Sequence, residues 1–118
     1  MLVLICGDRN WTSRAAVERE FNNHGLDPNR DTIMHGAARG ADTLAGTVGK
    51  QRGFPVKSYP ADWDKYGRAA GPIRNKQMLD QNPDLVLAFH PNIALSKGTG
   101  NMVKIAREKG TAVEVFEE

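Results

Sequence analysis

The chain of 118 residues has 40% hydrophobic and 25% charged residues, which is ordinary globular usage and argues against disorder or a fibrous repeat. Its net charge is only +2, without a Lys/Arg tract of the kind that binds nucleic acid, so nucleic acid is not an expected partner. The single cysteine, Cys6, excludes an intramolecular disulfide and a cysteine-based zinc site, and the three histidines lack metal-ligand spacing.

Five apolar runs alternate with helical patterns along the chain. In chain order these are strand 2–6, helix 13–24, strand 32–35, helix 40–52, strand 56–59, helix 72–81, strand 85–89, helix 99–109 and strand 112–116. The first and fourth runs are apolar without alternation, as is typical of strands covered on both faces. The order predicts an α/β fold: a Rossmann-like three-layer sandwich whose five-stranded, mostly parallel sheet carries helices on both faces.

The chain is expected to form one domain over residues 1–118. No apolar stretch approaches the roughly 20 residues of a membrane span, and no secretory leader pattern is present, which predicts a cytoplasmic protein without a membrane partner. No metal or other cofactor is expected. The irregular segment 60–71 is too long for a routine connection, which favours a functional role.

Ligands bind beyond the carboxyl ends of the strands in such a sheet. The segments after the first four strands are rich in Gly, Arg and small polar residues, which suits phosphate because glycine allows backbone amides to approach a ligand and helix N-termini are partially positive. The candidate phosphate-binding residues are Gly7, Arg9, Gly36, Arg39, Gly40, Arg74, Lys97, Gly98, Thr99 and Gly100, and the candidate base or sugar contacts are Asp42, Trp63 and Tyr66.

Two common nucleotide motifs do not fit the chain. Residues 96–99 read Ser-Lys-Gly-Thr, with lysine and glycine in the wrong order for a Walker A loop. GTGNMV at 98–103 lacks the third glycine of a dinucleotide fingerprint and follows the fourth strand. A P-loop NTPase and a dinucleotide dehydrogenase are therefore not expected.

Lys97 and Arg74 are predicted to meet at one anion, with the amides of residues 98–100 as its cradle. If Pro72 is the first helical residue, Arg74 lies in the first turn, where the helix dipole disfavours a cation and an anionic ligand would remove the conflict. Asp80 or Asp84 would serve equally as a structural partner of Arg74. Thr99 would serve as a helix N-cap as well as a phosphate contact.

Other candidates also have structural alternatives. Arg9 and Arg39 would equally form surface salt bridges, and Gly36 and Gly40 would shape the second turn without a ligand. Asp42 already suits the helix dipole in the first turn of its helix. Trp63 and Tyr66, in the long loop, would either stack on a base or have no ligand role, whereas Trp11 is expected to pack in the core.

Five segments together carry a resemblance: CGDRNWTS, HGAARGADTLA, PADWDKYGRAAGPIRNKQML, PDLVLAF and KGTGNMVKIAREKG. They resemble the YspA-like, YpsA-related branch of the superfamily that unites the DNA-processing protein DprA/Smf with the LOG proteins. The resemblance implies a Rossmann-like fold, a nucleotide or nucleotide-derived ligand, and a homodimer or higher homo-oligomer. The LOG members are phosphoribohydrolases that release a base from a nucleoside monophosphate, and Arg74 resembles the arginine of their upstream Arg-Lys motif.

The chain departs from the LOG pattern in two places. The longer HPNIALSK replaces a Pro-Gly-Gly lead-in, and Met102 stands where the LOG motif has glutamate. A thioether cannot supply the acid/base help that cleavage of an N-glycosidic bond needs. The leading expectation is therefore a sensor, carrier or sequestering protein for a phosphate-bearing nucleotide. A LOG-like hydrolase using Arg74 is the alternative, and single-stranded DNA binding by analogy with DprA is the third.

Overall fold

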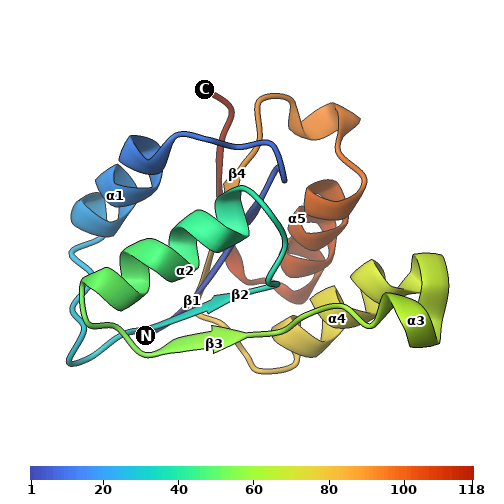
Figure 1. Ribbon diagram of the computed structural model, residues 1–118, viewed down its shortest axis with the longest axis horizontal. Helices are drawn as coiled ribbons and strands as arrows, with labels where there is room; N and C mark the ends of the chain where they lie inside the picture. The colour runs from blue at the N-terminus through green and yellow to red at the C-terminus, as the bar shows by residue number, and fades with distance from the viewer.

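The computed structural model describes residues 1–118 and contains one parallel sheet between two layers of helices (Figure 1). The strands are β1 (Leu2–Gly7), β2 (Thr32–His35), β3 (Val56–Ser58), β4 (Leu85–Phe89) and β5 (Ala112–Phe116). The α-helices are α1 (Arg14–Asn23), α2 (Ala41–Gln51), α3 (Trp63–Tyr66), α4 (Ala70–Leu79) and α5 (Gly98–Lys109), and the short 3₁₀ helices are η1 (Gly67–Ala69) and η2 (Ile93–Leu95).

The strand order is β3-β2-β1-β4-β5, and every neighbouring pair is parallel. This confirms the predicted α/β Rossmann-like sandwich and makes the sheet wholly rather than mostly parallel. β1 and β4 are central, so their two faces are both covered, which is why their sequences are continuously apolar. The chain turns from β1 to one side of the sheet and from β4 to the other, so the order reverses between these two strands.

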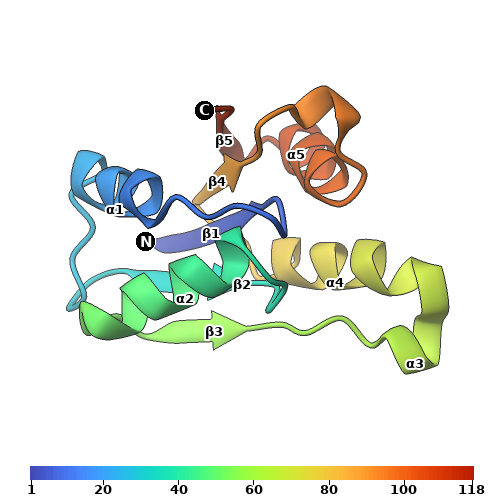
Figure 2. The same ribbon diagram turned by 45° about the horizontal axis from the view of Figure 1, so that its top comes forward.

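Alternate residues of β1 enter two separate cores. Val3 and Ile5 pack with α1 and α2, while Leu4 and Cys6 pack with α4 and α5. Figure 2 shows the two helix pairs on opposite sides of the sheet. The edge strand β5 follows the same rule, since Phe116 joins the first core and its neighbour Val115 the second. The helices are therefore fixed to the sheet by side-chain burial on both faces.

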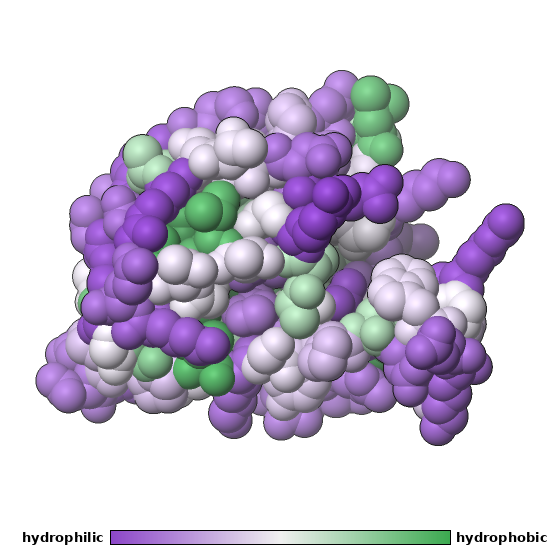
Figure 3. All heavy atoms as spheres, in the orientation of Figure 1, coloured by the Kyte–Doolittle hydropathy of each residue, from purple (hydrophilic) through white to green (hydrophobic).

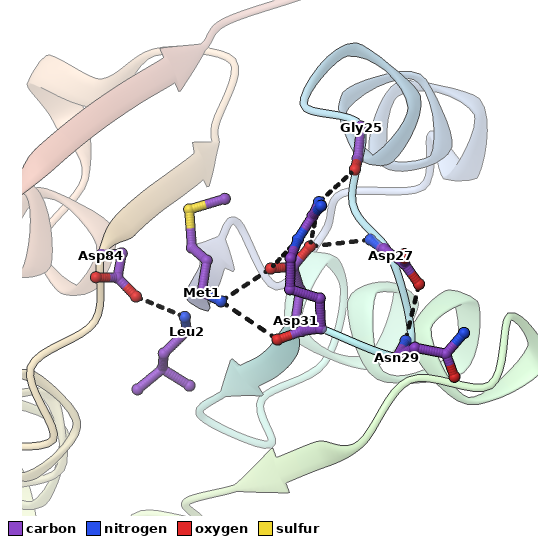
Figure 4. Close-up of polar contacts among 8 residues, drawn as sticks. Met1, Leu2, Gly25, Asp27, Asn29, Asp31 and Asp84 are labelled. Carbon is purple, nitrogen blue, oxygen red and sulfur yellow. Dashed lines mark hydrogen bonds and ion pairs between the residues drawn. The ribbon is translucent and has the colours of Figure 1, made fainter.

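The amino end is fastened by charged contacts (Figure 4). The Met1 ammonium donates to the fully buried carboxylate of Asp31 at 2.9 Å, and the Asp27 amide and Arg30 guanidinium donate to the same carboxylate. Burial alone would raise the pKa of Asp31, but these hydrogen bonds lower it to about 2. Asp84 accepts from the Leu2 amide at 2.7 Å, which ties the start of β1 to the turn before β4.

The segment 60–71, expected to be irregular, is mostly helical. Asp62 caps α3 by accepting from the Lys65 amide at 3.1 Å, and η1 continues directly into α4. The segment projects beyond the end of β3 (Figure 2). No helix of the structure combines the length and the apolarity that a membrane crossing requires.

Candidate functional site

A cavity of about 670 Å³ lies at the carboxyl edge of the sheet, beside the ends of β1 and β4. Its lining includes Cys6 and Gly7 from β1 and the first residues of α4 and α5. Trp63 and Leu95 also line it while 59% and 78% exposed, which places them at its mouth. The cavity therefore occupies the point where the strand order reverses, the usual ligand position in open α/β sheets.

The structure brings most of the predicted site residues to this cavity. Those that line it are Gly7, Arg9, Asp42, Trp63, Arg74, Lys97, Gly98 and Thr99. Those that do not are Gly36, Arg39, Gly40, Tyr66 and Gly100. The second group belongs mainly to the turn after β2, whereas the first comes from the end of β1, the starts of α2, α3 and α5, and the middle of α4.

Gly36 and Gly40 have structural reasons to be glycine. A Cβ at Gly36 would lie 2.9 Å from Asp42 Oδ2 and would collide with the guanidinium of Arg74. Gly40 has a φ of +77°, and a Cβ there would overlap the backbone of Arg9. Both glycines shape the second turn, which lets it pack closely against Arg74 and against the loop after β1.

The position predicted for Arg74 needs correction. α4 begins at Ala70 rather than Pro72, so Arg74 lies beyond the first turn and the expected conflict with the helix dipole does not arise. Its guanidinium donates to the Gly36 and Tyr59 carbonyls, and its Nε donates to Asn75 Oδ1 at 3.0 Å. Neither Asp80 nor Asp84 is its partner, because Asp80 pairs with Lys76 and Asp84 with the Leu2 amide.

The start of α5 also differs from the prediction. Ser96 Oγ accepts from the amides of Thr99 and Gly100, both at 3.1 Å, so Ser96 rather than Thr99 caps this helix. Thr99 is buried in the first turn. Two of the three amides expected to cradle a phosphate are thus already satisfied by a side chain, and an anion would have to displace the Ser96 hydroxyl to reach them.

Asp42 is the buried carboxyl of the site. It is 4% exposed, and its Oδ2 accepts from the Gly36 amide at 2.9 Å and from the Ala38 amide at 3.4 Å. Burial raises the pKa of Asp42 to about 6, against the opposing effects of the backbone hydrogen bonds and the positive charge of Arg74. Asp42 therefore organises the turn after β2 and changes its charge near neutral pH.

Three residues that the sequence did not single out complete the cavity wall. Arg68 enters from η1, and Ser96 caps α5. Asn75 is 5% exposed and donates to the Gly98 carbonyl and to Asn101 Oδ1 at 3.3 and 3.1 Å. Asn75 thereby joins α4 to the start of α5. In the sequence, only its position next to Arg74 pointed to Asn75.

The cavity is electropositive. Its basic side chains are Arg9, Arg68, Arg74 and Lys97, and its carboxyl groups are Asp8 and Asp42. Arg9, Arg68 and Lys97 form neither an ion pair nor a side-chain hydrogen bond, so the surface salt bridge considered for Arg9 is absent. Arg39 forms no salt bridge either, although it lies outside the cavity.

Trp11, His35 and Cys6 have structural roles. Trp11 is buried, its ring centroid lies 5.6 Å from that of Phe89, and its indole NH donates to the Ser13 carbonyl. The Nδ1 of His35 accepts from the Ala37 amide, and burial, aided by the charges of Lys50 and Arg74, lowers the pKa of His35. Burial likewise raises the pKa of the Cys6 thiol, so Cys6 is not a thiolate nucleophile.

Comparisons with known proteins agree with this architecture. Residues 1–66 match the model of the YspA, cpYpsA-related SLOG family. The chain is also similar to the Gene 61 protein of Mycobacterium phage D29, with 34% identity across 97% of this chain and 94% of that protein. No solved structure matches it. Because the family model covers more than half of the sequence, the chain belongs to the YspA, cpYpsA-related SLOG family, whose membership indicates a nucleotide-related function.

Proposed function

We propose that this protein binds a nucleotide or nucleotide-derived ligand through its phosphate in the cavity, as a sensor, carrier or sequestering protein. The observation that carries the proposal is the set of three basic side chains, Arg9, Arg68 and Lys97, that face one cavity without an ion-pair partner. Such side chains repel one another at close range, and a phosphate would relieve that repulsion. The cavity thus has the charge that an anionic ligand requires.

The placement and size of the cavity support the same ligand class. Its volume falls within the range of about 300–1,000 Å³ usual for small-molecule sites. The N-terminus of α5 contributes residues to it, and the partial positive charge of a helix N-terminus favours anions. Trp63 presents an uncovered aromatic ring at the mouth, suited to stacking on a base. Phosphate at the start of α5 and a base against Trp63 would use both features.

Asp42 favours a second candidate, hydrolysis of an N-glycosidic bond. It is a cavity-lining carboxyl whose pKa of about 6 suits an acid/base group. Met102 also lines the cavity and is 1% exposed, so a thioether occupies the place that resembles the LOG glutamate. Asp42 Oδ2 moreover accepts hydrogen bonds from two backbone amides, so this carboxyl already has a structural role. We therefore rank binding above hydrolysis.

The test is calorimetric titration of ligand-free protein with AMP, ADP, cyclic AMP and ADP-ribose, preceded by thermal-shift screening at millimolar concentration. Lys97→Ala and Arg68→Ala should each lower the affinity for the best ligand by about ten- to a hundredfold. This corresponds to the loss of about 1.5–3 kcal/mol of binding free energy expected for a charge-assisted contact. Lys104→Ala is the matched control, since Lys104 is exposed on α5 and lines no part of the cavity. No thermal shift with any nucleotide, or equal affinity in all three variants, would refute the proposal.

A further inference from the structure

A second cluster of polar side chains lies away from the cavity, between α1 and the edge strand β5. Glu20 and His24 are four residues apart at the end of α1, and Glu114 lies in the middle of β5 on the face that α1 covers. One ligand atom from each residue lies within 4.8 Å of the other two. None of the three lines the cavity, so the cluster is separate from the site proposed above.

The spacing of the ligand atoms matches one coordination sphere. His24 Nε2 lies 3.1 Å from Glu114 Oε2 and 3.8 Å from Glu20 Oε1. Two ligand atoms bonded at about 2.1 Å to a tetrahedral ion are about 3.4 Å apart, between these two values. The two distances to His24 Nε2 are therefore close to those of a bound ion, and the third pair of ligand atoms, on Glu20 and Glu114, lies within 4.8 Å.

The Glu20 carboxylate is held in a way that leaves one oxygen for a ligand. Glu20 is 4% exposed, and its Oε2 accepts from Arg19 Nε at 2.7 Å and from Asn23 Nδ2 at 3.3 Å. No hydrogen bond is directed at Oε1, which faces the His24 ring. Such outer hydrogen bonds orient a carboxylate ligand and reduce the entropy lost when an ion binds.

We propose that Glu20, His24 and Glu114 bind a divalent transition-metal ion of the zinc class. One imidazole nitrogen with two carboxylate oxygens is a donor set that Zn²⁺ and Co²⁺ accept, whereas Mg²⁺ and Ca²⁺ prefer oxygen ligands throughout. Glu114 is half-exposed, so the remaining coordination positions are open to water. The ion would join the end of α1 to an edge strand and act as a cross-link that stabilises the native state.

The experiment uses tag-free, chelator-treated protein titrated with ZnCl₂ in competition with a chromophoric chelator. One equivalent per chain should bind and should raise the melting temperature, because an ion that binds only the folded chain stabilises it. CoCl₂ should give visible absorption bands of a low-coordinate nitrogen and oxygen site. Glu114→Gln and His24→Ala should each lose at least tenfold in Zn²⁺ affinity.

Two matched variants serve as controls. Glu108→Gln removes an exposed carboxylate on α5, and His90→Ala removes a histidine from the cavity. Both should bind Zn²⁺ like the parent protein. Glu114→Gln changes an exposed side chain and should fold normally, so it decides the matter even if His24→Ala is destabilised. No stoichiometric Zn²⁺ binding, or binding that Glu114→Gln leaves unchanged, would overturn the proposal and leave the cluster as a structural contact between α1 and β5.

Discussion

Asp42→Asn should change how folding stability depends on pH. The pKa of Asp42 is raised from its ordinary value of 3.8 to about 6 by burial, so ionisation is less favourable in the folded state than in the unfolded chain. A raised carboxyl pKa stabilises the fold below pH 4 relative to higher pH, and this contribution is lost as pH rises toward 6. The full difference is about two pKa units, or about 3 kcal/mol.

Between pH 4.5 and 7.5 the free energy of unfolding of the wild type should fall by about 2 kcal/mol because of Asp42. The fall is smaller than the full difference because the carboxyl is already mostly ionised in the unfolded chain at pH 4.5. Asparagine keeps an oxygen for the Gly36 amide but does not titrate. The free energy of unfolding of Asp42→Asn, minus that of wild type, should therefore increase by about 2 kcal/mol across this range.

Urea denaturation at several pH values between 4.5 and 7.5 measures both proteins under the same conditions. Taking the difference removes the contributions of other groups, including Asp31, whose lowered pKa acts in the opposite direction. A difference between the two proteins that stays constant with pH would refute the reasoning. It would mean that Asp42 ionises as easily in the folded protein as in the unfolded chain.

Four further predictions follow from particular contacts. Asp31→Asn should destabilise the fold by about 1–3 kcal/mol at pH 7 in urea denaturation, with a smaller effect as pH falls from 4 toward 2. Gly40→Ala should cost at least about 1–3 kcal/mol in the same assay, because alanine disfavours its positive φ and its Cβ overlaps Arg9; full stability would contradict this. AMP incubated with the protein should release no adenine above the buffer rate by chromatography, since Met102 replaces the carboxylate; release that Asp42→Asn abolishes would favour the hydrolase. Light scattering at micromolar concentration should give at least twice the 13.0 kDa chain mass, and a 13 kDa species alone would contradict the expected oligomer.

The fold was predictable because burial on both faces leaves a direct trace in the sequence. Each central strand is an unbroken apolar run, and the helices between strands carry apolar stripes. The start of α4 differs from the prediction because Pro72 suits a first helical position, whereas η1 and α4 are continuous and place Pro72 inside the first turn. The preference of proline for the first turn of a helix therefore holds, but the helix begins two residues before Pro72.

The site was less predictable because its contacts join distant segments. The basic residues could be placed at the sheet edge from strand order alone, but nothing local shows that Arg74 meets the carbonyls of Gly36 and Tyr59. The capping role of Ser96 is not visible locally, because Thr99 in the same segment is also a favoured N-cap residue. On the face drawn in Figure 3 the apolar patches are limited in extent and are separated by hydrophilic residues, so this face shows no broad apolar surface for the predicted oligomer.

Arg74 and Asn75 together hold the walls of the cavity in place. Arg74 holds the segments after β2 and β3, and Asn75 holds the start of α5, so two consecutive residues of α4 connect both halves of the site. A guanidinium already occupied by carbonyl oxygens acts on an anion mainly through its charge, whereas Arg68 and Lys97 are free to donate directly. Arg74→Ala would therefore disturb the walls as well as the charge, which makes Lys97 and Arg68 the cleaner measures of ligand contact.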